Sequence, residues 1–528
     1  MPTARRIAHA FLERQGLTTI FGNPGSNELP FLAGLPESFR YVLGLHEGVV
    51  VGMADGYAQV TGGPALVNLH AAAGSGNAMG ALTNAVYARS PLVLTAGQQV
   101  RSAIGLEAML ANVDAPQLMR PLVGHSAEPA CAADVPRSLA QTVFEAELQR
   151  RPCYLSVPYD DWDAEVSSHA GDVLERRVRR GLTPDAEQLD DLVRDMGAAR
   201  NPVLVLGGDI DTAGHFDLAV ACAEHLDLPV WVAPSPHRLP FPNRHPLLRG
   251  VLPAGIGSVS SALAGHDLVL VVGAPVFRYH QHVPGPYLPD GARLIQVTDD
   301  AGAAARAPMG EALVADPGPV LTALMARLPQ RTSGSREFTP SPEPATASEG
   351  AALHPEGVFA ALRDTQPPGT RYVVESTSTN GAWWRQMDLR HPGSYFFPAS
   401  GGLGFGLPAA VGAALGDPDR PVVAVVGDGS ANYGITALWS AAHYRVPVTF
   451  LILRNGTYGA LRWFGTLLDT PDVPGTEIPG LDFTALAAGY GVPATAVTEL
   501  ADLREQLKKT ATDGPRLIQV DTHPTSPE

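Results

Sequence analysis

The segment 427–459 carries the residues whose types and spacing best suit chemistry. An apolar run, VVAVV, leads into GDG, and one crossover later a second apolar run, VTFLIL, leads into RNGT. Carboxylate, amide and carbonyl oxygens are the ligands of hard cations such as Mg²⁺, which keep a vertex for phosphate. The side chains of Asp428 and Asn455 and the carbonyl of Thr457 are therefore candidate metal ligands.

The same segment suits a diphosphate group. Gly427 and Gly429 let backbone N–H groups approach an anion, and the helix expected after Gly429 begins with a favourable dipole. A lone GDG at a strand end also suits a turn with a helix cap. The Asn-Gly pair one strand–helix–strand crossover later favours the binding interpretation.

The elements that position these residues follow a regular pattern. Short apolar runs alternate with amphipathic stretches, which is typical of parallel sheets covered by helices. Three series of buried strands are expected, and ligands bind at the carboxyl ends of such strands. The expected strands are TTIFGN, YVLGLH, ALVNLH, PLVLTAG and CYLSVP, then PVLVLGG, PVWVAP, DLVLVVG and RLIQVT, then RYVVEST, VVAVVGDG, VTFLILRN and RLIQVDT.

The series predict an α/β protein of three doubly wound parallel-sheet domains, 1–180, 181–340 and 341–528. The stretch 329–350, rich in Pro, Ser, Thr and Glu, is the clearest linker. The boundary near residue 180 is less distinct. The 528 residues are too many for one compact core.

Composition excludes several classes of function. A formal charge of −16 argues against nucleic-acid binding. No apolar stretch is long enough to span a membrane, and the N-terminus has no apolar core of a signal peptide. Three cysteines without CxxC spacing indicate neither a disulfide framework nor a zinc site. We therefore expect a cytoplasmic protein.

The segment GDGSANYGITALWSAAHYRVPVTFLILRNGTYG resembles the thiamine diphosphate motif of the decarboxylase and acetohydroxyacid synthase superfamily. Motifs along nearly the whole chain are similar to those of the benzoylformate decarboxylases: FGNPGSNELPF, LHAAAGSGNAMGAL, LSVPYDDWD, APVFRYHQ, ESTST, GGLGFGLPAA and NGTYGALRWF. The resemblance implies a carboxy-lyase that converts an aromatic 2-keto acid, benzoylformate first, into an aldehyde and CO₂. It also implies thiamine diphosphate with Mg²⁺ (or Ca²⁺), bound between pyrimidine-binding, central and diphosphate-binding domains.

The resemblance assigns catalytic roles to four residues. Glu47, before ADGYA, would meet the cofactor's aminopyrimidine ring, although a glutamate at a helix start is also a common dipole partner. Ser26 would hold the substrate carboxylate, and His70 would manage the alkoxide. His280 would deliver the last proton, with His282 as a nearby rival.

Further contacts are implied in the same way. The cofactor would meet Asn23, Pro24, Gly25, Glu47, Thr377, Ser378, Gly401, Leu403, Gly427, Asp428, Gly429, Ser430, Asn455, Thr457 and Tyr458. An apolar pocket for the phenyl group would consist of Met109, Leu110, Phe397, Ala460, Leu461 and Phe464. Each buried CH₂-sized area contributes about 0.8 kcal/mol, although most Leu and Phe side chains only pack in cores.

Three positions depart from the family pattern. Arg454 replaces an asparagine beside the expected metal ligand, Ala71 replaces a small hydroxyl residue, and Met109 replaces a leucine. The family also places Glu47 and the diphosphate site on different subunits. The resemblance therefore implies a homo-oligomer, most simply a dimer of dimers.

Other interpretations remain open. A carboligase, or a synthase of the acetohydroxyacid type with FAD in its middle domain, would share the fold; the middle domain here has no GxGxxG, which such FAD sites do not require. A pyruvate-type decarboxylase would carry a His-His pair where this chain has Asn112-Val113-Asp114. A relative that binds the cofactor without turnover would have lost Glu47 or both histidines.

Overall fold

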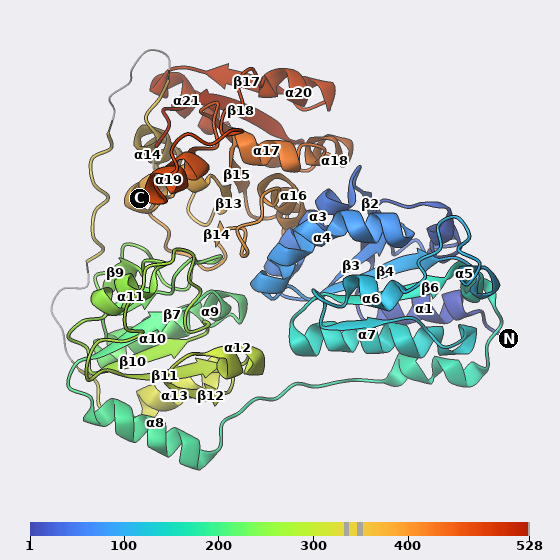
Figure 1. Ribbon diagram of the computed structural model, residues 1–528, viewed down its shortest axis with the longest axis horizontal. Helices are drawn as coiled ribbons and strands as arrows, with labels where there is room; N and C mark the ends of the chain where they lie inside the picture. The colour runs from blue at the N-terminus through green and yellow to red at the C-terminus, as the bar shows by residue number, and fades with distance from the viewer. Residues whose placement is uncertain (332–336, 346–351, 510, 526–528) are drawn as a thin grey trace.

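The computed structural model describes residues 1–331, 337–345, 352–509 and 511–525, which form three α/β units (Figure 1). Each unit contains one six-stranded sheet, and the strand pairs of the described residues are parallel. The first and third sheets share one topology, β2-β1-β3-β4-β6-β5 and β14-β13-β15-β16-β18-β17. The middle sheet, β12-β11-β10-β7-β8-β9, has the order of a dinucleotide-binding fold. The expected fold class is confirmed.

The strand bounds follow in chain order for each sheet. The first sheet contains β1 Thr19–Gly22, β2 Arg40–Leu43, β3 Ala65–Leu69, β4 Leu92–Gln98, β5 His125–Ala127 and β6 Cys153–Pro158. The second contains β7 Pro202–Leu206, β8 Val230–Val232, β9 Leu248–Val251, β10 Leu268–Val272, β11 Arg293–Thr298 and β12 Glu311–Val314. The third contains β13 Arg371–Glu375, β14 Tyr395–Phe396, β15 Val422–Gly427, β16 Val448–Arg454, β17 Ala494–Val497 and β18 Arg516–Asp521.

Every strand expected from an apolar run is present, and five further strands are not marked by such runs. These five, β5, β9, β12, β14 and β17, all lie at sheet edges. An edge strand is covered on fewer sides, so its sequence does not need a continuous apolar run. Strand β12, for example, has one buried residue among four.

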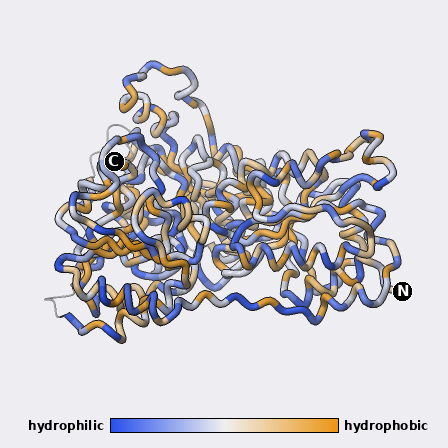
Figure 2. Tube along the Cα trace, turned by 60° about the horizontal axis from the view of Figure 1, so that its bottom comes forward, coloured by the Kyte–Doolittle hydropathy of each residue, from blue (hydrophilic) through white to orange (hydrophobic). Residues whose placement is uncertain are grey.

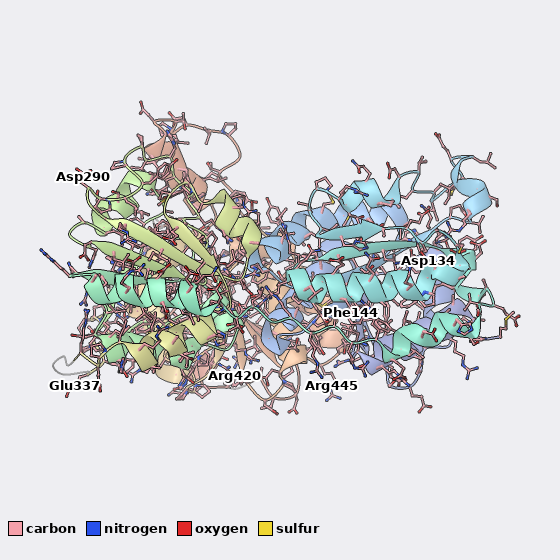
Figure 3. All side chains as sticks on the ribbon, turned by 90° about the horizontal axis from the view of Figure 1, so that it is seen from below. Asp134, Phe144, Asp290, Glu337, Arg420 and Arg445 are labelled. Carbon is pink, nitrogen blue, oxygen red and sulfur yellow. The ribbon has the colours of Figure 1, made fainter. Side chains whose placement is uncertain are left out.

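Helices cover both faces of the first sheet. α3 (Glu47–Thr61) and α4 (Ala71–Ala88) share a core with Val67 of β3, whereas α1 (Ala4–Arg14) and α7 (Val135–Gln149) share another with its neighbour Leu66. Successive side chains of a strand point to opposite faces. In Figure 3, the labels Asp134 and Phe144 mark α7 along one of these faces. Figure 2 shows the hydrophobic colour concentrated in the interior of the molecule and the hydrophilic colour along its outer edges.

The first and third units meet through α3 and α16 (Gly406–Gly416), which lie side by side in Figure 1. A Cβ atom added to Gly56 would lie 2.1 Å from the carbonyl oxygen of Ala409, and one added to Gly412 would lie 1.8 Å from that of Met53. Only glycine permits backbones to approach so closely. The crossing therefore fixes the position of α3, which begins at Glu47.

The connection from the first unit to the second is an extended segment that runs along the bottom of Figure 1 to α8 (Ala186–Ala198). We keep residue 180, which lies in this segment, as a proposed domain boundary. The second proposed boundary, residue 340, lies among described residues, but parts of the expected linker, 332–336 and 346–350, lie outside them. None of the described helices is long and apolar enough to cross a lipid bilayer.

Candidate active site

Asp428 and Asn455 lie together at the carboxyl ends of adjacent strands. β15 and β16 pair in parallel with Gly427 opposite Leu453, so the residues that follow both strands leave the sheet side by side. Oδ2 of Asp428 accepts hydrogen bonds from the backbone N–H groups of Asn455 (3.0 Å) and Gly456 (2.7 Å). Burial raises the pKa of Asp428, and these N–H donors oppose that rise.

Arg454, which stands where the family pattern has an asparagine, forms an ion pair with Asp521. Its guanidinium forms two 2.6 Å hydrogen bonds to the carboxylate of Asp521 on β18 and donates to the carbonyl of Leu481. The Asp521 carboxylate raises the pKa of Arg454, so the ion pair persists at neutral pH. The arginine therefore ties β16 to β18, and the hydrogen bonds of its guanidinium among the described residues go to Asp521 and Leu481.

Glu47 is the first residue of α3 and is 5% exposed. Its two carboxylate oxygens accept hydrogen bonds from the side-chain amides of Asn23 (3.1 Å) and Asn77 (3.0 Å). These donors come from the turn after β1 and from α4, and both are neutral. Glu47 thus presents a carboxylate whose charge no Lys or Arg cancels through an ion pair in the described part of the chain.

His70 follows β3 and precedes α4, and its ring is held by a buried glutamate. Nδ1 of His70 lies 2.7 Å from Oε2 of Glu28, which is 1% exposed. Glu28 also accepts hydrogen bonds from the N–H groups of Gly25 (2.8 Å), Ala71 (3.1 Å) and Gly97 (2.8 Å). With the carboxylate ionised, Nδ1 must carry the proton, which leaves Nε2 to exchange protons with a ligand.

The turn that carries Ser26 lies directly on this ring. A Cβ atom at Gly25 would lie 2.0 Å from Nδ1 of His70, so only glycine fits there. Ser26 begins the short helix Ser26–Glu28 and is exposed, whereas Glu28 in the same turn is buried. The turn therefore presents a hydroxyl outward and a carboxylate inward.

His280 and Phe464 meet although they come from different units. Their rings lie 4.9 Å apart in an edge-to-face arrangement. His280 belongs to the loop after β10, and Phe464 to α19 (Gly459–Leu467), which directly follows the Asp428 group. Of the two candidate proton donors, His280 and His282, it is His280 that makes this ring contact with Phe464.

The other expected cofactor contacts border the same regions. Thr377 and Ser378 follow β13, Gly427, Gly429 and Ser430 flank Asp428, and Tyr458 precedes α19. The loop with Gly401 and Leu403 is joined to α4 through the amide of Asn84, which donates to the carbonyl of Gly402 at 2.8 Å. Asn23, Pro24 and Gly25 precede the turn with Ser26.

The expected apolar pocket is only partly assembled. Met109 is 85% exposed, Leu110 37% and Leu461 52%. Ala460, Leu461 and Phe464 share α19, and the ring of Phe397 stacks at 6.3 Å on Tyr395. The described residues show no hydrogen bond or ring contact between the group of Glu47, Glu28 and His70 and the group of Asp428, His280 and Phe464.

Sequence reasoning missed Glu28 and Asn77. Glu28 lies in the NPGSNE motif, two residues after Ser26, but its partner His70 is 42 positions away and no local pattern links them. Asn77 lies in GNAMGAL on the exposed side of α4, where no local pattern marks it as a partner of Glu47. Glu28 is hydrogen-bonded to His70, and Asn77 is hydrogen-bonded to Glu47. Each missed residue therefore contacts a side chain that was expected to be catalytic.

The fold and this site define an enzyme of the thiamine diphosphate class. The thiamine pyrophosphate enzyme family matches the chain with its N-terminal TPP binding domain at residues 2–118, its central domain at 189–324 and its C-terminal TPP binding domain at 376–520. A benzoylformate decarboxylase of Pseudomonas aeruginosa is 58% identical over 529 residues and matches 100% of both chains.

Solved structures agree. A thiamine diphosphate-dependent 4-hydroxybenzoylformate decarboxylase from Rhodococcus jostii has a TM-score of 0.96 at 57% identity and covers 99% of both chains. A benzoylformate decarboxylase from Polynucleobacter necessarius has a TM-score of 0.94 at 36% identity, covering 100% of this chain and 99% of that one. The chain belongs to the thiamine pyrophosphate enzymes and, within them, to the benzoylformate decarboxylases.

Proposed function

We propose that the protein decarboxylates benzoylformate to benzaldehyde and CO₂ without oxidation. The observation that carries this proposal is the full-length 58% identity to a benzoylformate decarboxylase. The geometry supports it, because a histidine–glutamate pair and an aromatic-flanked histidine lie at the ends of strands. Bound thiamine diphosphate supplies a nucleophilic carbon and accepts the electron pair of the breaking carbon–carbon bond.

The chain's own residues orient the substrate and move protons. Ser26 is exposed, and its hydroxyl would donate a hydrogen bond to the substrate carboxylate. Nε2 of His70 exchanges a proton with the keto oxygen, while Glu28 holds Nδ1. His280, fixed against Phe464, delivers the proton that becomes the aldehyde C–H. Glu47 would lie against the ring nitrogen of the aminopyrimidine and favour its imino form.

The residues around Asp428 suit a hard divalent cation, Mg²⁺ or Ca²⁺. An ionised carboxylate has about four lone-pair sites, and Asp428 uses three for backbone N–H donors. Oδ1 of Asn455 accepts one hydrogen bond, from the N–H of Thr457, and keeps a second lone pair. Asp428, Asn455 and the carbonyl of Thr457 would hold the ion. Activity lost in EDTA and restored by Mg²⁺ supports this assignment, and full activity in EDTA contradicts it.

A second copy of the chain completes the site. Among the described residues, no hydrogen bond or ring contact joins the Glu47 group to the Asp428 group, and three side chains expected to meet the phenyl group, Met109, Leu110 and Leu461, are exposed. We infer a homodimer in which each chain gives one group to each site, with a dimer of dimers as the full assembly. A cytoplasmic location fits the three cysteines, which are all unpaired.

The decisive experiment measures CO₂ release from benzoylformate, 4-hydroxybenzoylformate and pyruvate, with and without thiamine diphosphate. We expect kcat/KM for benzoylformate to exceed that for pyruvate by roughly tenfold or more, because the pocket must bury a phenyl group. Faster turnover of pyruvate, or cofactor-independent turnover, would sink the proposal. The 4-hydroxy substrate shows whether a para hydroxyl is accepted.

A further inference from the structure

The loop of residues 397–405, between β14 and α16, carries Gly401 and Leu403, which are expected to contact the cofactor. Its backbone turns sharply, since Gly401 and Gly404 have φ angles of 78° and 99°, a region that favours glycine. The loop lies outside the helices and strands, whose regular hydrogen bonds satisfy backbone groups elsewhere in the fold. Its shape therefore depends on hydrogen bonds from other segments.

Asn84, on α4 of the first unit, binds this loop through both ends of its amide. Nδ2 donates to the carbonyl of Gly402 (2.8 Å), and Oδ1 accepts hydrogen bonds from the backbone N–H (3.1 Å) and the hydroxyl (2.6 Å) of Ser400. Asn84 is 2% exposed, so water competes little for these hydrogen bonds. The amide therefore fixes the two residues that flank Gly401.

Side chains of the other two units hold the loop on either side of its centre. The guanidinium of Arg278, in the second unit, donates to the carbonyl of Ala399 (2.9 Å). Glu375, at the end of β13 in the third unit, is 0% exposed and accepts hydrogen bonds from the N–H groups of Gly404 and Gly406 at 2.6 Å each. All three units thus contribute a side chain that holds the loop.

Asn84 also shares a face of α4 with two groups of the candidate active site. His70 precedes the helix, and Asn77 and Asn84 follow it at intervals of seven residues. Seven residues make two helical turns with an offset of about 20°, so the three side chains lie along one face. Asn77 is hydrogen-bonded to Glu47. The helix that holds Glu47 near its start therefore holds the loop 397–405 near its end.

We propose that Asn84 is a positioning residue, which fixes the loop of Gly401 and Leu403 in the shape that binds thiamine diphosphate. Asn84 acts through the backbone of the loop. This inference rests on the proposed function, because that proposal makes the two loop residues cofactor contacts. A loop that already has its bound shape loses less conformational entropy on binding, so its affinity is higher. The defect expected without Asn84 is thus in cofactor affinity rather than in the chemical step.

The test is calorimetric titration of thiamine diphosphate, with Mg²⁺ present, into the full-length protein freed of cofactor. Asn84→Ala should raise the Kd roughly tenfold, as expected for a lost buried hydrogen bond, while kcat at saturating cofactor changes less than twofold. Ser400→Ala, at an exposed loop residue, removes the hydroxyl that donates to Asn84 and should raise the Kd roughly threefold.

Asn201→Ala is the matched control, because the Asn201 amide also donates to a carbonyl, that of Gly265 at 2.9 Å, but in the second unit. It should leave the Kd unchanged. A lower melting temperature with an unchanged Kd in Asn84→Ala would show that Asn84 only supports the fold and would overturn the proposal. Equal increases of the Kd in Asn84→Ala and Asn201→Ala would also overturn it.

The Ser400 variant decides the matter if Asn84→Ala does not fold, and an unchanged Kd in Ser400→Ala then overturns the proposal. Because binding is the readout, these results are separate from the choice of substrate. A wild-type protein that binds thiamine diphosphate without decarboxylating benzoylformate would refute the proposed function, and the comparison of Kd values would still test Asn84.

Discussion

At the scale of single residues, the site depends on two buried carboxylates, Glu28 and Glu47, which differ in their hydrogen-bond donors. Glu28 accepts four hydrogen bonds and thereby fixes the His70 ring, the turn with Ser26 and the end of β4 together. Glu47, by contrast, accepts its hydrogen bonds from two neutral side-chain amides in the described part of the chain. The Glu28 carboxylate therefore holds neighbouring segments in place, whereas the Glu47 carboxylate remains available to a ligand.

We expect Glu28→Gln to lower kcat for benzoylformate by roughly 10²-fold or more while KM changes little, because His70 loses the acceptor that fixes its proton on Nδ1. Steady-state kinetics and thermal melting measure both effects. Glu37→Gln, at an exposed glutamate nearby, is the control and should behave as wild type. A Glu28 variant that melts lower yet keeps its kcat would show a purely structural role.

Glu47→Gln separates the two interpretations of that residue. If Glu47 contacts the cofactor, kcat/KM falls by roughly 10²-fold or more while stability changes little. If it is only a dipole partner of α3, the loss is at most about 1 kcal/mol of stability, without loss of activity. Glu187→Gln, in the first turn of α8, is the control for the dipole effect.

At the scale of elements, the contact between α3 and α16 fixes the position of the first unit relative to the third. Both helices are rich in small residues where they meet, and both contribute to one continuous core. Because α3 begins at Glu47 and α16 follows the loop of Gly401 and Leu403, a shift at the crossing reaches both expected cofactor contacts.

Gly56→Ala should therefore destabilise the protein by roughly 1–3 kcal/mol, since its Cβ would collide with the backbone of Ala409. Thermal melting and activity should both decline. Gly80→Ala is the matched control on α4, where a Cβ would meet nothing within 4 Å. That variant should gain about 0.5–1 kcal/mol, as expected for alanine in place of glycine in a helix. Equal effects at both sites would contradict the argument.

α3 also carries a buried acid that makes stability depend on pH. Burial raises the pKa of Asp55 to about 6, and its Oδ2 has no hydrogen-bond partner among the described residues. The folded state thus holds a proton that the unfolded chain, in which an aspartic acid has its ordinary pKa of 3.8, has already released. The stabilisation is fully present below that value and is lost as pH rises to about 6.

We expect the stability of the wild type, relative to Asp55→Asn, to fall by roughly 2 kcal/mol between pH 4 and pH 6. The variant cannot ionise at this position, so the difference isolates the contribution of Asp55. Melting temperatures of both proteins across this pH range provide the measurement. A difference that is constant with pH would show that Asp55 does not change its protonation there.

At the scale of the whole molecule, the proposed dimer assigns the two halves of each site to different chains. Subunit complementation tests this directly with Glu47→Gln and Asp428→Asn, each inactive alone. Random mixing of the two chains in dimers should restore about one quarter of wild-type activity, because half the dimers are mixed and each of these has one intact site. Separately purified variants mixed without subunit exchange are the control. Mixed dimers without activity would show that each chain forms its own site.

The sequence alone determined the central strands, because a strand buried on both faces must be a continuous apolar run, as in β15 and β16. It also determined that Asp428 and Asn455 converge, since one crossover separates them and parallel strands end at one edge. The sequence did not predict five edge strands, β5, β9, β12, β14 and β17. An edge strand is partly exposed, so it does not need a continuous apolar run.

Only the tertiary structure decided which distant groups meet. Glu28 meets His70, and His280 meets Phe464, because sheets and helix crossings bring remote loops together. Local sequence patterns do not predict such long-range contacts, because each residue would fit its own turn or helix equally well without its distant partner. The direction of Arg454, toward Asp521 and away from the Asp428 group, was decided in the same way.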